Sequence, residues 1–219
     1  MFDWITVLLQ TILTFFYNIT VLLGWANYGF AIILLTIAIK VILYPLTVKQ
    51  VKSMRSMAEL QPQMKALQTK YKDNKEKLQK EIARLYKESG VNPLSGCLPI
   101  IVQMPILIAI FWAIKDYTYD FDKTFLWLPE LNAPDPYYIL PILSALTTWY
   151  STVQMQAASP TPTGNGPNPQ KIMVYAMPVF IGYISLQFPA GLVLYWVTSN
   201  VCQIAQQWWM YRGQPAVSQ

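Results

Sequence analysis

The apolar run from Trp25 to Leu46 contains a single charged residue, Lys40, and this run constrains the fold more than any other part of the chain. A helix that crosses a bilayer needs about 20 predominantly apolar residues, and the run is long enough. A lysine near the middle of such a helix costs roughly 2.5–3.5 kcal/mol on insertion scales, so a helix that keeps one usually turns it toward water, a partner or a site. What Lys40 faces is therefore the first question about this chain.

The composition favours an integral membrane protein. Charged residues make up 12% of the chain, against about 25% in soluble domains, and the mean hydropathy is +0.29. There is no histidine in the sequence, which excludes His-based acid–base catalysis and His metal ligands. Cys97 and Cys202 show no metal-ligand or redox spacing, and no Walker-type phosphate loop is present. We therefore expect no metal, no cofactor and no enzyme activity.

The distribution of charge predicts the orientation in the membrane. From Lys49 to Glu88 there are eleven Lys/Arg and five Asp/Glu, 11 − 5 = +6, whereas from Lys115 to Pro136 there are two Lys and five acids, 2 − 5 = −3. Basic loops stay in the cytoplasm. The first loop is therefore expected inside and the second outside, which places the N-terminus outside and the C-terminus in the cytoplasm.

The apolar segments and the loops between them predict an all-α membrane protein with five transmembrane helices. A polar stripe through Asp3, Thr6, Gln10, Thr14 and Asn18 favours an amphipathic helix lying in the membrane interface, with a sixth spanning helix as the alternative. In chain order we expect an interfacial helix (1–23), a first span (24–51), a cytoplasmic helical hairpin (52–92), a second span (93–116), an external loop (117–136), a third span (137–157), a cytoplasmic loop (158–170), a fourth span (171–187), a fifth span (189–211) and a short tail (212–219).

The basic loop has the pattern of two antiparallel helices. Apolar residues recur at steps of three and four from Met54 to Tyr71 and again from Leu78 to Leu85, on either side of a polar turn at 72–75. A basic outer face at the membrane surface fits acidic partners such as anionic lipid headgroups or ribosomal RNA, although a solvated charged face is the plainer interpretation. The residues expected to make such contacts, to a substrate or a ribosome, are Lys52, Arg55, Lys70, Lys72, Lys75 and Lys77.

Two interpretations are open for Lys40. Its stem could snorkel toward the cytoplasmic interface, or it could face a water-filled cavity that opens inward. The apolar segments 25–46, 95–115, 137–157, 171–187 and 189–211 contain no Asp or Glu to pair with it. Polar residues on Lys40's own helix face and in the other spans favour the cavity, and they include Thr36, Gln103, Gln154 and Asn200, each of which could instead form an interhelical hydrogen bond.

Four stretches resemble the YidC group of membrane protein insertases, which is related to the Oxa and Alb proteins. They are YGFAIILLTIAIKVILYPLTVKQ (28–50), LYKESGVNPLSGCLPIIVQMPI (85–106), DPYYILPIL (135–143) and FPAGLVLYWVTSNVCQIAQQ (188–207). The resemblance covers nearly the whole chain. It implies a hydrophilic groove that is open to the cytoplasm and to lipid and closed outside, with a family arginine position held here by Lys40 and groove positions at Tyr195 and Trp196.

The resemblance also implies a function and partners. A protein of this group, in a bacterial plasma membrane, would pass hydrophilic segments of nascent membrane proteins into a positively charged groove and release their helices to lipid without nucleotide hydrolysis. Its partners would be nascent membrane proteins, the ribosome and the Sec translocon, together with anionic lipids at the hairpin and no specific nucleic-acid sequence. The alternative is a small-solute transporter or channel, because broken helices and a midplane cation are transporter features.

Overall fold

The computed structural model describes residues 3–72, 74–91, 98–115, 117, 124–158 and 169–212, and within these ranges the chain is all-α. An isolated bridge between Phe125 and Leu128 is the extent of β-type pairing in the same ranges. The helices are α1 (Asp3–Leu22), α2 (Tyr28–Ile42), α3 (Tyr44–Glu59), α4 (Gln61–Lys70), α5 (Lys75–Glu88), α6 (Leu98–Lys115), α7 (Ile139–Ala158), α8 (Pro169–Ser185) and α9 (Ala190–Tyr211).

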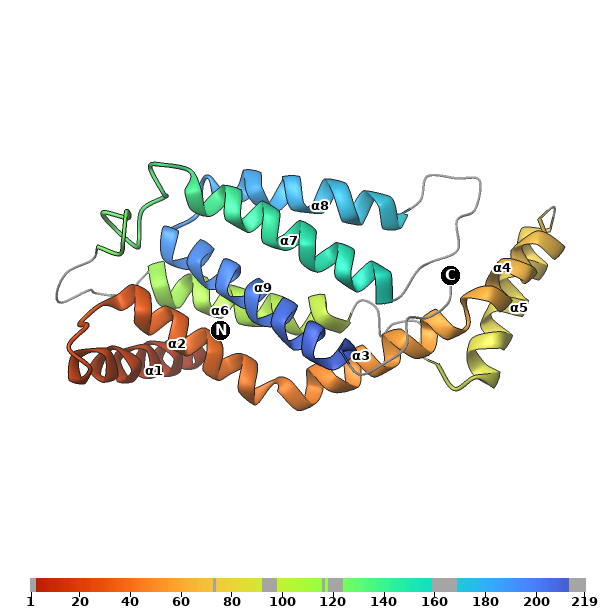
Figure 1. The fold of residues 1–219 in the computed structure, drawn as a ribbon, viewed down its shortest axis with the longest axis horizontal. Helices are drawn as coiled ribbons and strands as arrows, with labels where there is room; N and C mark the ends of the chain where they lie inside the picture. Colours follow the sequence, from red (N-terminus) through yellow and green to blue (C-terminus); the bar gives the residue numbers. More distant parts are fainter. Residues whose placement is uncertain are drawn as a thin grey trace.

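The helices form a bundle with an arm at one end (Figure 1). Helix α9 is central to the bundle because it packs against α2, α6 and α7, while α8 packs against α7. Helix α3 leads out of the bundle, and α4 and α5 lie side by side in the arm beyond it (Figure 1). The all-α class expected from the sequence is therefore the class of the structure.

A bend divides the segment that was expected to form the first span. Helix α2 ends at Ile42, and α3 begins at Tyr44 with its axis turned by 60°. Pro45, in the first turn of α3, has no N–H to donate to the preceding turn, and its ring clashes with the carbonyl four residues earlier, so the helix breaks there. Helix α3 then continues without interruption across the expected boundary between span and hairpin at residues 51–52.

Taken singly, no helix in the described ranges has both the length and the hydropathy of a membrane span, and α2 with α3 meets both criteria as a bent pair.

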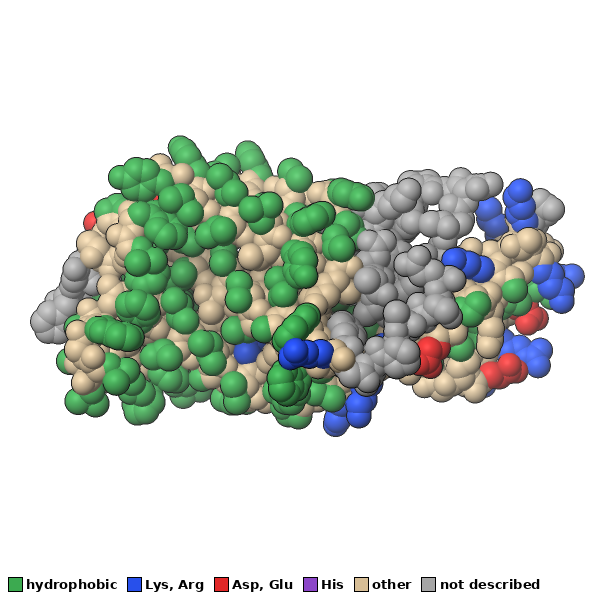
Figure 2. All heavy atoms as spheres, in the orientation of Figure 1, with side chains coloured by type: hydrophobic (Ala, Val, Ile, Leu, Met, Phe, Trp, Pro, Cys, Tyr) green, Lys and Arg blue, Asp and Glu red, His purple; other side chains and the backbone are tan. Residues whose placement is uncertain are grey.

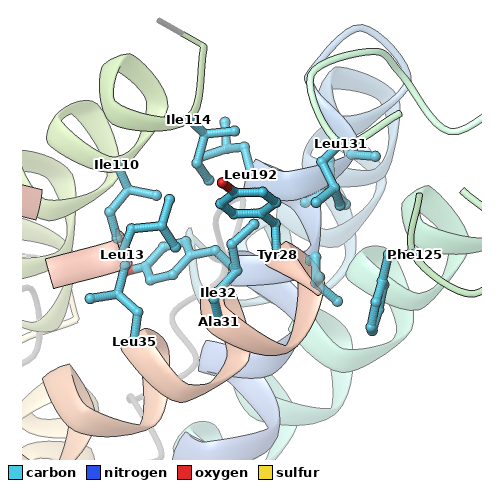
Figure 3. Packing of buried hydrophobic residues seen from close by; sticks show 14 of the residues in the cluster. Leu13, Tyr28, Ala31, Ile32, Leu35, Ile110, Ile114, Phe125, Leu131 and Leu192 are labelled. Atoms are coloured by element: carbon cyan, nitrogen blue, oxygen red, sulfur yellow. The ribbon is translucent and has the colours of Figure 1, made fainter. Parts of the chain in front are cut away.

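A large cluster of buried hydrophobic residues lies where α1, α2, α6 and α9 meet the loop before α7 (Figure 3). Tyr28, at the start of α2, is 2% exposed and stacks on Tyr17 of α1 with ring centroids 4.0 Å apart. From the loop, Phe125, Leu128 and Leu131 are all buried in the same cluster. Burial of these side chains closes this end of the bundle with apolar contacts.

The same loop also completes the start of α9. The first N–H groups of a helix have no partner within the helix. Here the N–H of Ala190 donates to the carbonyl of Ala133, and that of Gly191 donates to the carbonyl of Leu131, both at 2.8 Å. A side chain at Gly191 would lie within 3.2 Å of Leu131 and of two core isoleucines, so glycine permits this close approach. The loop is therefore a structural part of the bundle.

Asp135 organises the turn into α7. Its side chain is 3% exposed, and its carboxylate accepts hydrogen bonds from the Leu140 N–H at 2.7 Å, the Tyr137 N–H at 3.0 Å and the Trp127 indole at 3.3 Å. A carboxylate at this place satisfies unpaired amides of the first helical turn and complements the helix dipole. This aspartate thus fixes both the loop and the start of α7.

We expect Asp135→Ala to lower the free energy of unfolding by about 2–4 kcal/mol, since buried donors left without an acceptor cost roughly 1–3 kcal/mol each. Unfolding by SDS in mixed micelles measures the change. Glu130→Ala, which removes an exposed acid from the same loop, is the matched control and should have little effect. Equal losses in the two variants would contradict the role given to Asp135.

The N-terminal helix turns part of its polar stripe toward protein. The side-chain amide of Gln10 donates to the carbonyl of Ala113 at 3.3 Å, and the hydroxyls of Thr14 and Tyr117 lie 2.7 Å apart. Trp4 and Phe15 are exposed on the opposite side of α1. The stripe was expected to face water, but a carbonyl of α6 and the Tyr117 hydroxyl just after α6 satisfy two of its members. The interfacial position of α1 stays a prediction.

Candidate functional site

Two kinds of surface are separated along the molecule. Apolar side chains cover the bundle, whereas charged side chains gather over the α4–α5 arm (Figure 2). Large apolar side chains are exposed on α2, α6, α7, α8 and α9, with Tyr175, Val179 and Phe180 of α8 each more than half exposed. An apolar exterior of this kind matches lipid as its solvent.

A polar cavity lies inside this apolar exterior, at the bend between α2 and α3. Water can enter about 40 Å³ of it, and one water molecule needs roughly 10–15 Å³ of such space, so the cavity has room for a small group of waters. We call it the Lys40 cavity. Its polar lining comes from α2, α3, α6 and α9 and comprises Lys40, Thr47, Gln50, Gln103, Gln203, Gln206 and Gln207.

Lys40 is the charged residue of this lining and stands in the last turn of α2. Its side chain is partly exposed rather than enclosed. No carboxylate in the described part of the chain forms an ion pair with it, and the ion pairs found there, Glu76–Lys80 and Arg84–Glu88, belong to α5. The cavity therefore offers a cation to an anionic group of a partner.

Three glutamines of α9 supply the opposite wall. Gln203, Gln206 and Gln207 are three and four residues apart, which places them on one side of a helix. The Gln206 amide donates to the main-chain carbonyl of Lys40 at 3.3 Å and so ties α9 to the end of α2. The side-chain oxygens of Gln206 and Gln207 are buried without a hydrogen-bond donor from the described residues, and Gln207 is 1% exposed. These oxygens can accept hydrogen bonds from water or from the amides of a bound chain.

Gln103 links α6 to the same wall. Its side-chain amide donates to the Tyr195 hydroxyl at 2.7 Å, and Tyr195 itself is 2% exposed. Gln103 lines the cavity. Tyr195 is not part of the lining, but it accepts the hydrogen bond that positions the Gln103 side chain. The arrangement fixes the position of one polar side chain at a place where three helices converge.

The other expected groove residues lie outside the lining of the cavity. Thr36 is fully buried, and its hydroxyl donates to the carbonyl of Ile32 at 2.7 Å within α2. Trp196 and Asn200 turn toward α7, where their side-chain N–H groups donate to the Thr148 hydroxyl at 3.0 Å and 2.9 Å. Gln154, on α7, has a buried side-chain oxygen without a donor from the described residues. Of the seven residues, the structure brings Lys40, Gln103 and Tyr195 together.

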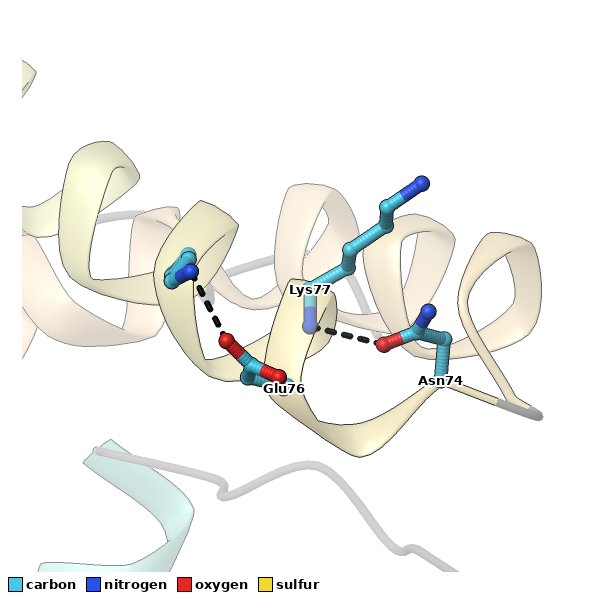
Figure 4. A network of polar contacts seen from close by, with 4 residues as sticks. Asn74, Glu76 and Lys77 are labelled. Carbon is cyan, nitrogen blue, oxygen red and sulfur yellow. Dashed lines mark hydrogen bonds and ion pairs between the residues drawn. The ribbon is translucent and has the colours of Figure 1, made fainter.

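The basic residues expected to contact a substrate or ribosome fall into two places. Lys52 and Arg55 lie on α3, near the bundle, whereas Lys70, Lys72, Lys75 and Lys77 surround the turn between α4 and α5 and are exposed. At that turn the side chain of Asn74 accepts the Lys77 N–H at 3.0 Å and caps α5, while the Lys77 ammonium extends away from the network (Figure 4).

Inside the arm, the Tyr86 hydroxyl of α5 donates to the Met64 sulfur of α4 at 3.3 Å. Burial raises the pKa of Tyr86 further above neutral pH, where a tyrosine hydroxyl is protonated in any case. Met64 is buried against α5, and the contact fixes the two helices side by side.

Comparison with known proteins gives matches over nearly the whole chain. Residues 18–217 match the sequence model of the family described as 60Kd inner membrane protein. A membrane protein insertase YidC of Clostridium perfringens is 42% identical over 94% of this chain and 87% of its own length. A membrane protein insertase YidC of Haemophilus influenzae is 46% identical over 86% of this chain, which spans 34% of that protein.

The fold also matches a solved structure. A crystal structure described as an active YidC insertase with its first transmembrane domain resolved superposes with a TM-score of 0.68 at 29% sequence identity. The match covers 92% of this chain and 46% of that one. The chain thus spans about half of the solved structure and about a third of the Haemophilus protein, but most of the Clostridium protein.

Proposed function

Because the chain belongs to the family described as 60Kd inner membrane protein, and its relatives are named YidC insertases, we propose that it inserts nascent proteins into the cell membrane. The relatives confirm the resemblance seen in the sequence, and they confirm a membrane protein that is not an enzyme. The observation that carries the proposal is the Lys40 cavity, where a cation and amide oxygens that have no partner among the described residues lie inside an apolar bundle.

In the proposed mechanism, a short hydrophilic segment of the substrate approaches from the cytoplasm, and its polar side chains reach into the cavity. Lys40 attracts its acidic side chains, and the glutamines of α9 accept hydrogen bonds from its amides, so that polar groups reach membrane depth at a lower cost. The substrate's apolar helix then moves into lipid along the exposed faces of the bundle. Burial of apolar area, about 25 cal/mol per Å², supplies the driving force.

We further propose that α2 with the start of α3, α6, α7, α8 and α9 are five spans, with the N-terminus outside and the arm in the cytoplasm. The apolar side chains exposed on these helices and the basic side chains on the arm support this arrangement. The arm then receives nascent chains, a ribosome or the Sec translocon through the exposed lysines of its turn. A solute channel is less well supported, because buried loop residues such as Leu128 and Leu131 pack the outer end of the bundle.

Photocrosslinking to a stalled nascent chain tests the proposal. A photoreactive residue at Gln103 or Gln203 should crosslink to the hydrophilic segment of a single-span substrate, because both positions line the cavity. The same residue at Tyr175, on the exposed face of α8, is the control and should not react with that segment. Crosslinks from Tyr175 together with none from the cavity would overturn the cavity as the entry site.

Gln207 gives a second test, in which stability and function should separate. Gln207→Met removes a buried acceptor that has no described donor, so the free energy of unfolding should stay the same or rise by up to about 1–3 kcal/mol. Insertion into liposomes should nevertheless fall several-fold, because the substrate loses an acceptor. Gln187→Met, at an exposed position after α8, is the control. Unchanged insertion in Gln207→Met would contradict the role of the α9 glutamines.

A further inference from the structure

A second cavity lies where the start of the arm meets the end of α9. It has a volume of about 370 Å³ and is separate from the Lys40 cavity except for the shared wall residue Val51. Figure 1 shows the C-terminal end of α9 beside α3 at this level. Its lining consists of Val48, Val51, Lys52, Arg55, Ser56 and Glu59 of α3 and Met210 of α9.

The lining changes character along α3. Val48 and Val51, nearest the bend, form an apolar wall with Met210, whereas Lys52 and Arg55 supply cationic donors farther along, and the Ser56 hydroxyl donates within α3 to the Lys52 carbonyl. Glu59 adds one acceptor at the end toward the arm. The charges of the lining, two cations and one carboxylate, sum to +2 − 1 = +1. A ligand that fits this cavity has an apolar part, one negative charge and a hydroxyl or similar donor.

The end of α9 indicates the depth of the cavity in the membrane. Trp208 and Trp209 are both more than half exposed, next to Met210, and the Arg212 guanidinium lies 4.5 Å from the centre of the Trp208 ring. Exposed tryptophans with adjacent basic residues are typical of the boundary between hydrocarbon and headgroups. The cavity is therefore at headgroup level, given the membrane arrangement proposed above.

We propose that this cavity is a binding site for one anionic phospholipid with a hydroxyl-bearing headgroup, of the phosphatidylglycerol type. The phosphate diester accepts hydrogen bonds from Lys52 and Arg55, and a headgroup hydroxyl donates to Glu59. The start of an acyl chain lies against Val48, Val51 and Met210. A bound lipid of this kind joins α3 to the end of α9 and so sets the angle of the arm at the bend.

The chemistry of the lining favours a lipid over a free anion or a nucleic acid. Free phosphate has no apolar part to place against the two valines and Met210. A nucleic acid backbone binds more tightly to a row of cations, and the Glu59 carboxylate would repel its phosphates. The exposed lysines of the α4–α5 turn are a separate surface, which makes them useful as a control.

The test is lipid binding to the purified full-length chain in detergent, followed by native mass spectrometry with phosphatidylglycerol or phosphatidylcholine added. The parent should retain phosphatidylglycerol about tenfold more strongly than phosphatidylcholine, as expected for one added charge-assisted contact. Lys52→Gln/Arg55→Gln should lose this preference, while Lys75→Gln/Lys77→Gln, with the same loss of charge at the arm turn, should keep it. Lys52→Gln alone, at an exposed side chain, should weaken the preference and serves if the double variant does not fold.

Three results would overturn the proposal: a preference that survives in Lys52→Gln/Arg55→Gln, a preference lost equally in the control pair, or displacement of the lipid by millimolar inorganic phosphate. The last would indicate a site for free anions. Binding is measured without substrate, and insertion is measured in parallel in liposomes. A chain that binds the lipid but inserts nothing would contradict the proposed function, whereas one that inserts without the preference would contradict the lipid site.

Discussion

Insertion of a substrate with an acidic external segment is expected to fall about 10- to 100-fold in Lys40→Ala, because a hydrogen bond to a charged group contributes roughly 1.5–3 kcal/mol. Lys40→Glu should reduce insertion further, since two like charges then meet in a small cavity with little water. Lys40→Arg should retain most of the activity, because it keeps the cation and adds a planar donor group suited to carboxylates. Insertion into liposomes containing the purified variants measures all three.

The substrate and a second lysine provide the controls. A version of the substrate with its acidic residues changed to Asn and Gln should be inserted almost equally by the parent and Lys40→Ala. Lys115 is the last residue of α6 and does not line the Lys40 cavity. Lys115→Ala removes an exposed lysine that lies over the Phe111 and Trp112 rings and should leave insertion unchanged. If the neutral substrate loses as much as the acidic one in Lys40→Ala, the lysine acts on the fold or on hydration of the cavity and not on substrate charge.

The sequence was sufficient to predict the all-α class and the position of Lys40 beside a polar cavity, because both follow from local patterns. A lone cation in an apolar run has a cost that only water or a partner offsets, and the structure places Lys40 beside a cavity with room for a few waters. Gln103 was identified for a similar reason, as a polar residue within an apolar segment. A charged or polar residue within an apolar segment can be recognised from its neighbours in the sequence, without knowledge of how the helices pack.

Which of the other polar residues line the cavity depends on how the helices pack against one another. Thr36 shares a helix face with Lys40, yet its hydroxyl bonds within α2, and Asn200 turns to α7. Conversely, Gln50 lines the cavity because the 60° bend brings α3 alongside it, and a straight span from 24 to 51 does not predict that contact. The spacing of Gln203, Gln206 and Gln207 was a readable sign of one polar helix face.

The role of the loop before α7 could not be predicted, because it depends on contacts between distant segments. Gly29 illustrates this. A side chain at Gly29 would fall onto the ring of Phe125, which is 4% exposed, and the Asn27 amide donates to the Thr124 carbonyl at 2.7 Å beside it. Nothing local to either segment indicates that the start of α2 and residues 124–125 meet. Closure of this end of the bundle therefore depends on a glycine that looks ordinary in the sequence.

We expect Gly29→Ala to lower the free energy of unfolding by about 2–4 kcal/mol, because the Phe125 ring must leave its place in the core or the backbone must shift. Gly24→Ala is the control: a side chain there meets nothing within 4 Å, and only the positive φ of 80° adds a cost of about 1–2 kcal/mol. Unfolding by SDS measures the stability of both variants, and hydrogen exchange at residues 124–138 should rise in Gly29→Ala alone.

A double-mutant cycle with Phe125→Ala separates steric conflict from a general effect on the helix. Phe125→Ala by itself should cost about 3–5 kcal/mol through lost burial. Once the ring is gone, adding Gly29→Ala should cost little or even stabilise α2, since alanine is the better helix former by about 1 kcal/mol. A coupling close to the full cost of Gly29→Ala would show that the two positions act through one contact. Additive losses would instead mean that the glycine is needed for the backbone of α2, and that the loop closes this end of the bundle without its help.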